Sequence, residues 1–297
     1  MPTPLINTPR TDRTPPRSGF TTVPPAPLQS AGWSLPEAAV RAAVADRYAS
    51  LGYVVVHVPG SSPVAADLGV LADALGLGSV FTPPLYATSP HTAGGVSRLT
   101  ATGVGSGAGH PFEGRAGQRV HCDGTLQDLG QIPTTVMLCA AAAAEGGHSF
   151  LVDLPAAFAV LRERDPEAAA QLVHPGALVR TSTLVQGRSR SGPAFAPDGD
   201  GGWVTRFSRT ATDTYHPLSG GGAALGRALE FLDEAAAEGS RFRAGFTLAA
   251  GQALVLANDR LGHGRTAYRD DPDVPRLLLR GLFTRRPAPV AVGGRTS

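Results

Sequence analysis

The sequence contains no lysine. All 26 of its Lys+Arg residues are arginine, and 24 acidic residues leave a formal net charge of +2. This usage is typical of a high-GC coding sequence, and no dense basic run follows the chain. The charge pattern therefore gives no reason to expect nucleic acid as a partner. One basic pair near the C-terminus, Arg285-Arg286, is expected to be solvated.

Cysteine and long apolar runs are also scarce. The chain has two cysteines, Cys122 and Cys139, too few for a secreted disulfide framework. No apolar run reaches the ~20 residues of a membrane span. The first residues show no charged start followed by an apolar stretch. We therefore expect a cytoplasmic protein with no membrane partner.

The 297 residues and 42% hydrophobic content suffice for one large packed domain. Residues 1–34 are rich in Pro, Thr and Arg and predict a mobile or draped arm. Residues 35–286 are expected to form the domain, and 287–297 a C-terminal tail. The Gly-rich run 103–109 lies in a long loop that fits either a site wall or a plain surface excursion.

Short β-branched segments of unequal length, such as 53–58, 134–139, 253–256 and 276–283, predict strands. Helical spacing predicts helices at 35–51 and 223–237, the first ending at Gly52. Strict strand–helix alternation is absent, and no G-x-G-x-x-G opens a helix, which disfavours a Rossmann sheet. The pattern favours a mainly β fold with helical decoration, a double-stranded jelly roll.

The most informative stretch is His121-Cys122-Asp123-Gly124. In an extended backbone His121 and Asp123 point to the same face, so both can reach one metal ion while Cys122 packs away from it. A His and a carboxylate are two thirds of the two-histidine, one-carboxylate set that holds non-haem Fe(II) and leaves positions open.

A third ligand must come from another histidine. His57 sits within an apolar strand and fits a core role, and His110 and His148 flank the site segments. His263 follows an apolar strand between two glycines, which favours it. The candidates that stay open beside it are His57, His91, His110, His148, His174 and His216.

Arg276 and Arg280 project from one face of a Leu-rich strand, with Leu277 and Leu279 on the other. Buried arginine is costly unless it meets an anion, so this pair predicts a carboxylate-binding site. A dicarboxylate co-substrate would supply such an anion through a bidentate contact.

These motifs, with Gly146-Gly147-His148-Ser149 and Asn258-Asp259-Arg260, follow one another in a familiar order. Over residues 119–283 the chain resembles the TauD/TfdA-type Fe(II)/2-oxoglutarate-dependent dioxygenases, the group that includes clavaminate synthase. The resemblance implies that His121, Asp123 and His263 bind Fe(II) and that Arg276 pairs with the distal carboxylate of 2-oxoglutarate. Ser149 stands where the family usually has a Thr that contacts the same carboxylate.

The resemblance also implies that Arg280 helps to bind an acidic group of the substrate. Related halogenases have Gly or Ala in place of Asp123, so the intact carboxylate argues against halogenation. Arg206, Arg209 and Gln127 are further candidate substrate contacts. The aromatic residues Phe112, Phe207 and Tyr215 fit either the pocket or the core, and we favour the core.

The expected activity is hydroxylation of a C–H bond in a small polar metabolite, amino-acid-like or a natural-product intermediate. Fe(II), 2-oxoglutarate and O2 would be consumed with release of succinate and CO2, and a reducing cytoplasm suits a ferrous site. Desaturation, cyclisation or epoxidation at the same iron stays open. So do a non-catalytic metal-binding jelly roll, a Zn2+ hydrolase and a homo-oligomer.

Overall fold

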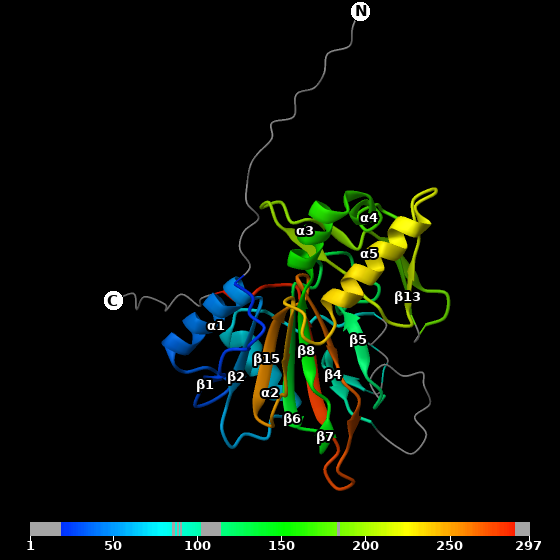
Figure 1. Cartoon of the computed structure of the whole chain (residues 1–297). Helices are drawn as coiled ribbons and strands as arrows, with labels where there is room; N and C mark the ends of the chain where they lie inside the picture. Colours follow the sequence, from blue (N-terminus) through cyan, green and yellow to red (C-terminus); the bar gives the residue numbers. More distant parts are fainter. Residues whose placement is uncertain are drawn as a thin grey trace, which may run out of the picture.

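The computed structural model describes residues 19–84, 87, 89, 91–101, 114–182 and 185–288. Two antiparallel-rich sheets form the centre, with α1 and α2 on one side and α3, α4 and α5 on the other (Figure 1). The first 18 residues of the expected arm lie outside the described residues. The rest of the arm packs on the body, where Trp33 is buried.

The larger sheet has seven strands, all antiparallel except the first pair. Its order is β1 (Leu28–Gln29), β2 (Tyr53–His57), β15 (Gln252–Ala257), β6 (Thr134–Ala141), β18 (Leu277–Phe283), β4 (Val96–Leu99) and β3 (Thr92–Ala93). Helices α1 (Ala38–Leu51) and α2 (Ala65–Ala74) cover its outer face through Tyr48, Leu68 and Leu71. Gly52 ends α1 in the left-handed conformation, as expected from the sequence.

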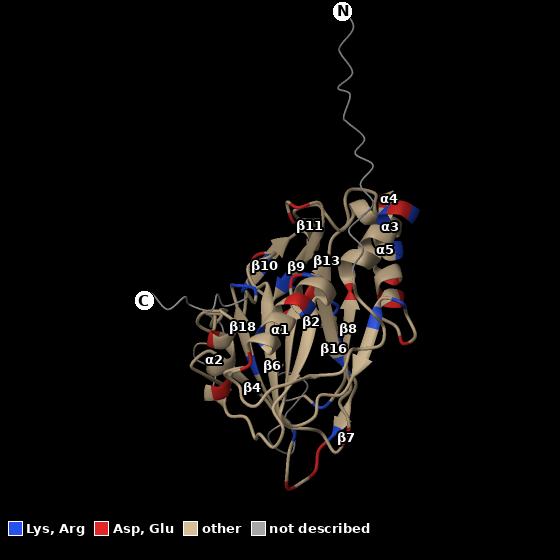
Figure 2. Ribbon diagram, turned by 90° about the vertical axis from the view of Figure 1, so that its left-hand side faces the viewer, with Lys and Arg blue, Asp and Glu red and all other residues tan. Residues whose placement is uncertain are grey.

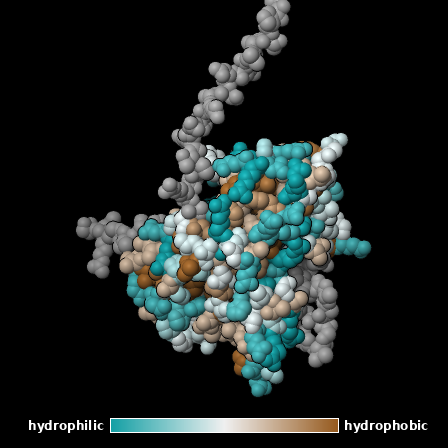
Figure 3. Space-filling view, in the orientation of Figure 1, coloured by the Kyte–Doolittle hydropathy of each residue, from teal (hydrophilic) through white to brown (hydrophobic). Residues whose placement is uncertain are grey.

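The smaller sheet has four strands, in the order β14 (Arg243–Phe246), β8 (Ser149–Asp153), β16 (Leu261–Arg265) and β5 (Gln118–His121). Its outer face packs on α3 (Leu154–Arg164), α4 (Pro166–Ala170) and α5 (Gly222–Ala235). Charged residues gather on these helices and on peripheral loops, while the central strands are mostly uncharged (Figure 2). Hydrophilic side chains predominate over the α5 side of the surface (Figure 3).

A further apolar cluster lies between the two sheets. Met137, Leu254 and Leu278 contribute to it from the larger sheet, and Leu151 and Leu261 from the smaller one. Because side chains alternate along a strand, each sheet presents one face to a helical layer and the other to this interior.

Three small sheets complete the described fold: β10 (Ser189–Gly192), β9 (Leu178–Thr181) and β13 (Asp213–Tyr215); β11 (Phe195–Pro197) with β12 (Trp203–Thr205); and β17 (Tyr268–Arg269) with β7 (Glu145–Gly146). Among the described helices, none combines the length and apolar character needed to cross a bilayer.

Strand β16 was not expected, because Gly262 and Gly264 have poor strand propensity. Tertiary packing requires them there. A Cβ on Gly262 would lie 2.6 Å from Val120 Cγ2, and one on Gly264 would lie 2.3 Å from Phe150 Cζ. The glycines that flank His263 thus allow the outer face of the sheet to close behind it. They do not create the approach to a metal that the sequence suggested.

Candidate active site

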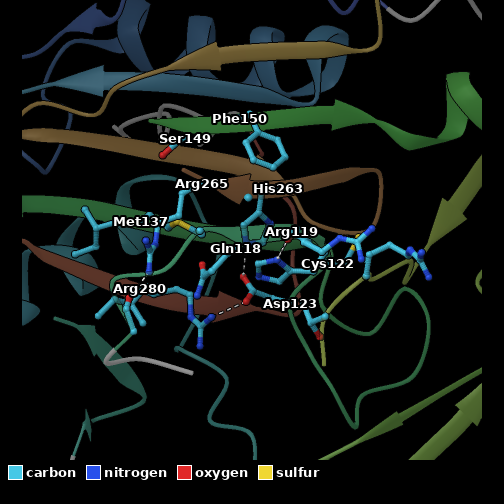
Figure 4. Close-up of a pocket in the computed structure, with 18 of the residues that line it drawn as sticks. Gln118, Arg119, Cys122, Asp123, Met137, Ser149, Phe150, His263, Arg265 and Arg280 are labelled. Carbon is cyan, nitrogen blue, oxygen red and sulfur yellow. Dashed lines mark hydrogen bonds and ion pairs between the residues drawn. The ribbon is translucent and has the colours of Figure 1, made fainter. Parts of the chain in front are cut away.

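A cavity of about 740 Å3 opens between the inner faces of the two sheets. Its size is typical of small-molecule sites. Residues of β5, β6, β8, β16 and β18 line it, His121 among them. Figure 4 shows others of the lining, including Met137, Ser149, His263 and Arg280.

The structure brings His121, Asp123 and His263 together in this cavity. Their candidate ligand atoms all lie within 4.8 Å of one another. His121 and His263 are register partners on β5 and β16, with ring centroids 4.3 Å apart. Asp123 follows β5 directly, and its Oδ2 lies 3.6 Å from His263 Nε2. Of the five other histidines that the structure describes, none joins a three-residue ligand cluster within the described residues.

Neighbouring groups hold these side chains in place. His121 Nδ1 lies 2.9 Å from the Arg119 carbonyl, which leaves Nε2 for a metal. Asn258 accepts from the Asp123 amide at 2.7 Å and donates to its carbonyl at 3.2 Å. Thr135 Oγ1 donates to Asp123 Oδ2 at 3.0 Å.

The electrostatics suit a divalent cation. Burial, followed by the neighbouring His121, lowers the pKa of His263 to about 3, so the imidazole is neutral as a ligand must be. Burial alone would raise the pKa of Asp123, but the guanidinium of Arg280 and the hydrogen bond from Thr135 hold this pKa at about 2. Two neutral imidazoles and one carboxylate are the donor set that non-haem Fe(II) takes. The residues present therefore fit the implied metal.

One end of the cavity is rich in arginine. Arg276, just before β18, places its guanidinium carbon 5.0 Å from the Tyr268 ring centroid, and Arg265 lies 4.5 Å from the same centroid. Ser149 on β8 is the register partner of Arg265. Burial, and then Arg276, lower the pKa of Arg265 to about 10. Arg265 belongs to the motif His263-Gly264-Arg265, but neither it nor Tyr268 was given a role from the sequence.

Arg280 also lines the cavity, on the same face of β18 as Leu278. Its Nη1 donates to Asp123 Oδ1 at 2.6 Å, as the dashed line in Figure 4 shows. Leu279 points into the opposite core, so the expected division of this strand into a guanidinium face and a leucine face is confirmed.

Other candidates lie away from the cavity or in the core. Arg206 and Gln127 are buried, but neither belongs to the described lining. Arg206 Nη2 donates weakly to the Thr125 and Arg190 carbonyls at 3.3 and 3.4 Å. Phe207 and Tyr215 pack in the core beneath α5, as favoured from the sequence. Phe112 and His110 lie outside the described residues.

Cys122 packs in the same core, and burial raises the pKa of its thiol. Arg209 lines the cavity wall, where its guanidinium pairs with Asp233 at 2.9 Å.

Sequence reasoning missed Arg180, which is 3% exposed. From β9 its Nη1 donates to the Cys122 and Gly124 carbonyls, at 2.9 and 3.3 Å, on either side of Asp123. Its Nε pairs with Asp213 at 3.1 Å. The available signal was an arginine within an otherwise apolar strand, but its partners are 28 to 58 residues away.

Comparison with known proteins identifies this arrangement. The family model "Taurine catabolism dioxygenase TauD, TfdA family" matches residues 22–282. A uridine-5'-phosphate dioxygenase from Amycolatopsis sp. is 40% identical over 241 residues, covering 80% of this chain and 86% of the relative. A second, from Streptomyces sp., is 36% identical over 243 residues, with the same coverage of 80% and 86%.

Among solved structures, asparagine oxygenase in complex with Fe(II), 2S,3S-3-hydroxyasparagine and succinate superposes with a TM-score of 0.63 at 17% identity. The match covers 84% of this chain and 81% of the oxygenase, and it shows a shared fold. With the His-Asp-His cluster in place, the chain belongs to the TauD/TfdA family and is a dioxygenase that uses Fe(II) and 2-oxoglutarate.

Proposed function

We propose that this protein hydroxylates a C–H bond of uridine-5'-phosphate, or of a closely related 5'-nucleotide. The observation that carries the proposal is the 40% identity, over 80% of the chain, to a uridine-5'-phosphate dioxygenase. The bound Fe(II), with 2-oxoglutarate and O2, would supply the oxidising chemistry and leave succinate and CO2 as by-products.

The charge of the cavity supports a phosphorylated substrate. Seven arginines and a single acidic residue, Asp123, are among its lining side chains. Four of these arginines already pair with carboxylates that do not belong to the lining, namely Arg115, Arg119, Arg180 and Arg209. Three guanidiniums thus face one carboxylate, and a divalent metal would add more positive charge. Such a cavity favours two anionic ligands, a 2-oxo dicarboxylate and a phosphomonoester, over a zwitterionic substrate.

The proposed roles follow from the positions of the side chains. His121, Asp123 and His263 would hold Fe(II), while Arg276 and Ser149 would bind the distal carboxylate of 2-oxoglutarate. Arg280, next to Asp123, would orient the substrate phosphate and keep the carboxylate ionised. The apolar side chains between the two sheets would exclude bulk water from the reacting centre.

We also propose that the two main sheets together form a double-stranded β-helix. Their antiparallel pairing and the apolar cluster between them support this arrangement. Metal ligands on β5 and β16 would then lie at one mouth of the barrel, where open coordination positions face the cavity.

Succinate release measured with Fe(II), 2-oxoglutarate and O2 tests the activity. We expect uridine-5'-phosphate to stimulate succinate formation strongly and uridine only weakly. Mass spectrometry of the nucleotide product should show one added oxygen or the breakdown of such a product. Succinate formation that responds equally to L-asparagine and to the nucleotide would contradict the proposed substrate.

Arg280→Gln sharpens this test. If Arg280 contacts the phosphate, the variant should lose about 10-fold or more in kcat/KM for uridine-5'-phosphate but little for uridine. An equal loss for both would assign Arg280 to positioning Asp123 alone. Arg269→Gln is the control, because Arg269 is an exposed arginine paired with Glu145 outside the cavity.

A further inference from the structure

Arg265 occupies an unusual position for an arginine. It is the last residue of β16, two residues after the proposed ligand His263, and lines the same cavity. Across β8 its register partner is Ser149, the residue proposed to contact the co-substrate. The side chain is 9% exposed, so its charge is largely removed from water.

No carboxylate touches the guanidinium of Arg265 in the described part of the chain, although Asp270 acts on it from a longer range. The hydrogen bonds from its guanidinium go to main-chain carbonyls, those of Gly114, Arg115 and Thr266. In the described part of the chain it forms no ion pair with a carboxylate. A buried cation of this kind is costly unless an anion completes the site.

Arg276 shares this environment. Both guanidiniums lie against the ring of Tyr268, with carbon-to-centroid distances of 4.5 Å for Arg265 and 5.0 Å for Arg276. Arg276 also passes close to Gly147, where a Cβ would lie in ordinary van der Waals contact with Arg276 Nε at 3.7 Å. Two like charges held on one aromatic ring are stabilised when an anion lies between or beside them.

We propose that Arg265 is a second guanidinium for the distal carboxylate of 2-oxoglutarate, acting with Arg276 and Ser149, and that it makes the site selective for 2-oxo dicarboxylates. The inference rests on the co-substrate placement of the proposed function but not on the identity of the nucleotide. It assigns to Arg265 a contact with a carboxylate, beyond its support of the main chain around residue 114.

The test is an anaerobic titration of the Fe(II)-loaded protein without nucleotide. The visible charge-transfer band of the bound 2-oxo acid reports binding. Two ligands are compared: 2-oxoglutarate, and 2-oxopentanoate, which has the same chain length but no distal carboxylate. Arg269→Gln is the matched control, four residues further along the chain and outside the cavity.

We expect Arg265→Gln to weaken 2-oxoglutarate binding by about 10- to 100-fold, the loss typical of a charge-assisted hydrogen bond. Its affinity for 2-oxopentanoate should change less than about 3-fold, because the missing contact is not made with that ligand. Arg265→Lys keeps the charge without the planar fork and should fall between wild type and Arg265→Gln.

Equal weakening of both ligands in Arg265→Gln would assign Arg265 to a structural role and overturn the proposal. Should that variant fail to fold, Arg265→Lys carries the same comparison. Arg276→Gln distinguishes failure of the proposed co-substrate placement from failure of the proposed role of Arg265. If it leaves 2-oxoglutarate binding unchanged, the co-substrate placement itself fails. If it weakens binding while Arg265→Gln does not, only the role of Arg265 fails.

Discussion

Two buried arginine sites in the cavity wall differ in what neutralises them. Arg180 meets Asp213 at 3.1 Å, and both side chains are at most 3% exposed. It also donates to two carbonyls that flank Asp123. At the other end, Arg265 and Arg276 share an aromatic ring and form no ion pair in the described chain. The same residue type thus forms an ion pair within the fold at one end, while at the other it has no such partner and is proposed to bind the co-substrate.

The difference separates structural from binding roles. A buried arginine paired with a buried aspartate contributes to holding a loop, because removing either partner leaves an uncompensated charge. A buried arginine with no carboxylate gives up stability in the free protein and regains it when an anion binds. Mutations at the two ends should therefore change different measurable quantities.

The largest expected effect is the loss of activity when Asp123, which lies between the two arginine sites, is replaced. Asp123→Ala removes a proposed iron ligand and the acceptor of the Arg280 bond. Fe(II)-dependent succinate formation should fall by more than about 100-fold, beyond what loss of an outer partner costs. Metal affinity measured by titration should fall with it. Full-rate oxidation in this variant would show that the metal assignment is wrong.

Arg180→Met and Arg276→Met compare the effect of removing a buried arginine at the two ends of the cavity. The first breaks a buried ion pair and should lower the free energy of unfolding by about 3–5 kcal/mol. The second removes a cation that has no ion-pair partner in the described chain. It should leave the free energy of unfolding nearly unchanged, while the affinity for 2-oxoglutarate falls about 10- to 100-fold. Urea unfolding of the apoprotein and ligand titration measure the two effects. A similar decrease in the free energy of unfolding in both variants would contradict the division into a structural and a binding arginine site.

Acid should affect the Arg180 end selectively. Burial alone would raise the pKa of Asp213, but Arg180 and the hydroxyls of Ser208 and Thr210 hold it below the ordinary 3.8. A carboxyl whose pKa is lowered by folding stabilises the folded state at any pH above its unfolded pKa of about 3.9. This stabilisation is lost as the pH falls through the pKa of the folded state. The difference in the free energy of unfolding between wild type and Asp213→Asn should therefore become smaller below about pH 4. A difference in the free energy of unfolding that stays constant from pH 7 to about pH 3 would contradict this account.

Ser149 is expected to give the smallest change. Ser149→Ala removes one neutral hydroxyl from the arginine-rich end and should weaken 2-oxoglutarate binding about 3- to 10-fold. Ser149→Thr restores the hydroxyl and should bind within about 2-fold of wild type. The same charge-transfer titration measures both, and an unchanged affinity in Ser149→Ala would exclude the serine from the carboxylate contact.

The linear pattern was enough for the parts of the site that are close in the chain. Spacing placed His121 and Asp123 on one face, and the division of 276–280 into a guanidinium face and a leucine face was correct. Gly52 as the end of α1 was also correct, because helix ends follow local chemistry. The third ligand did not follow from the residues alone, since seven histidines competed without a distance to separate them.

Contacts over long separations were not foreseen. Arg286 is exposed, as expected, but its pairing with the buried carboxylate of Asp259 at 2.6 and 3.2 Å was not foreseen. Strand β16 was missed because its glycines disfavour a strand unless Phe150 and Val120 press against them.

By itself the sequence determined which residue types were available: a histidine and an aspartate two residues apart, a Leu-rich segment with two arginines on one face, and no lysine. These properties depend on local periodicity, which a strand expresses wherever it lies. Only the tertiary structure decided which histidine completes the triad, which arginines are neutralised, and which are left for ligands. Those outcomes depend on pairings between residues as far apart as Asp123 and Arg280, and the local pattern does not encode such distances.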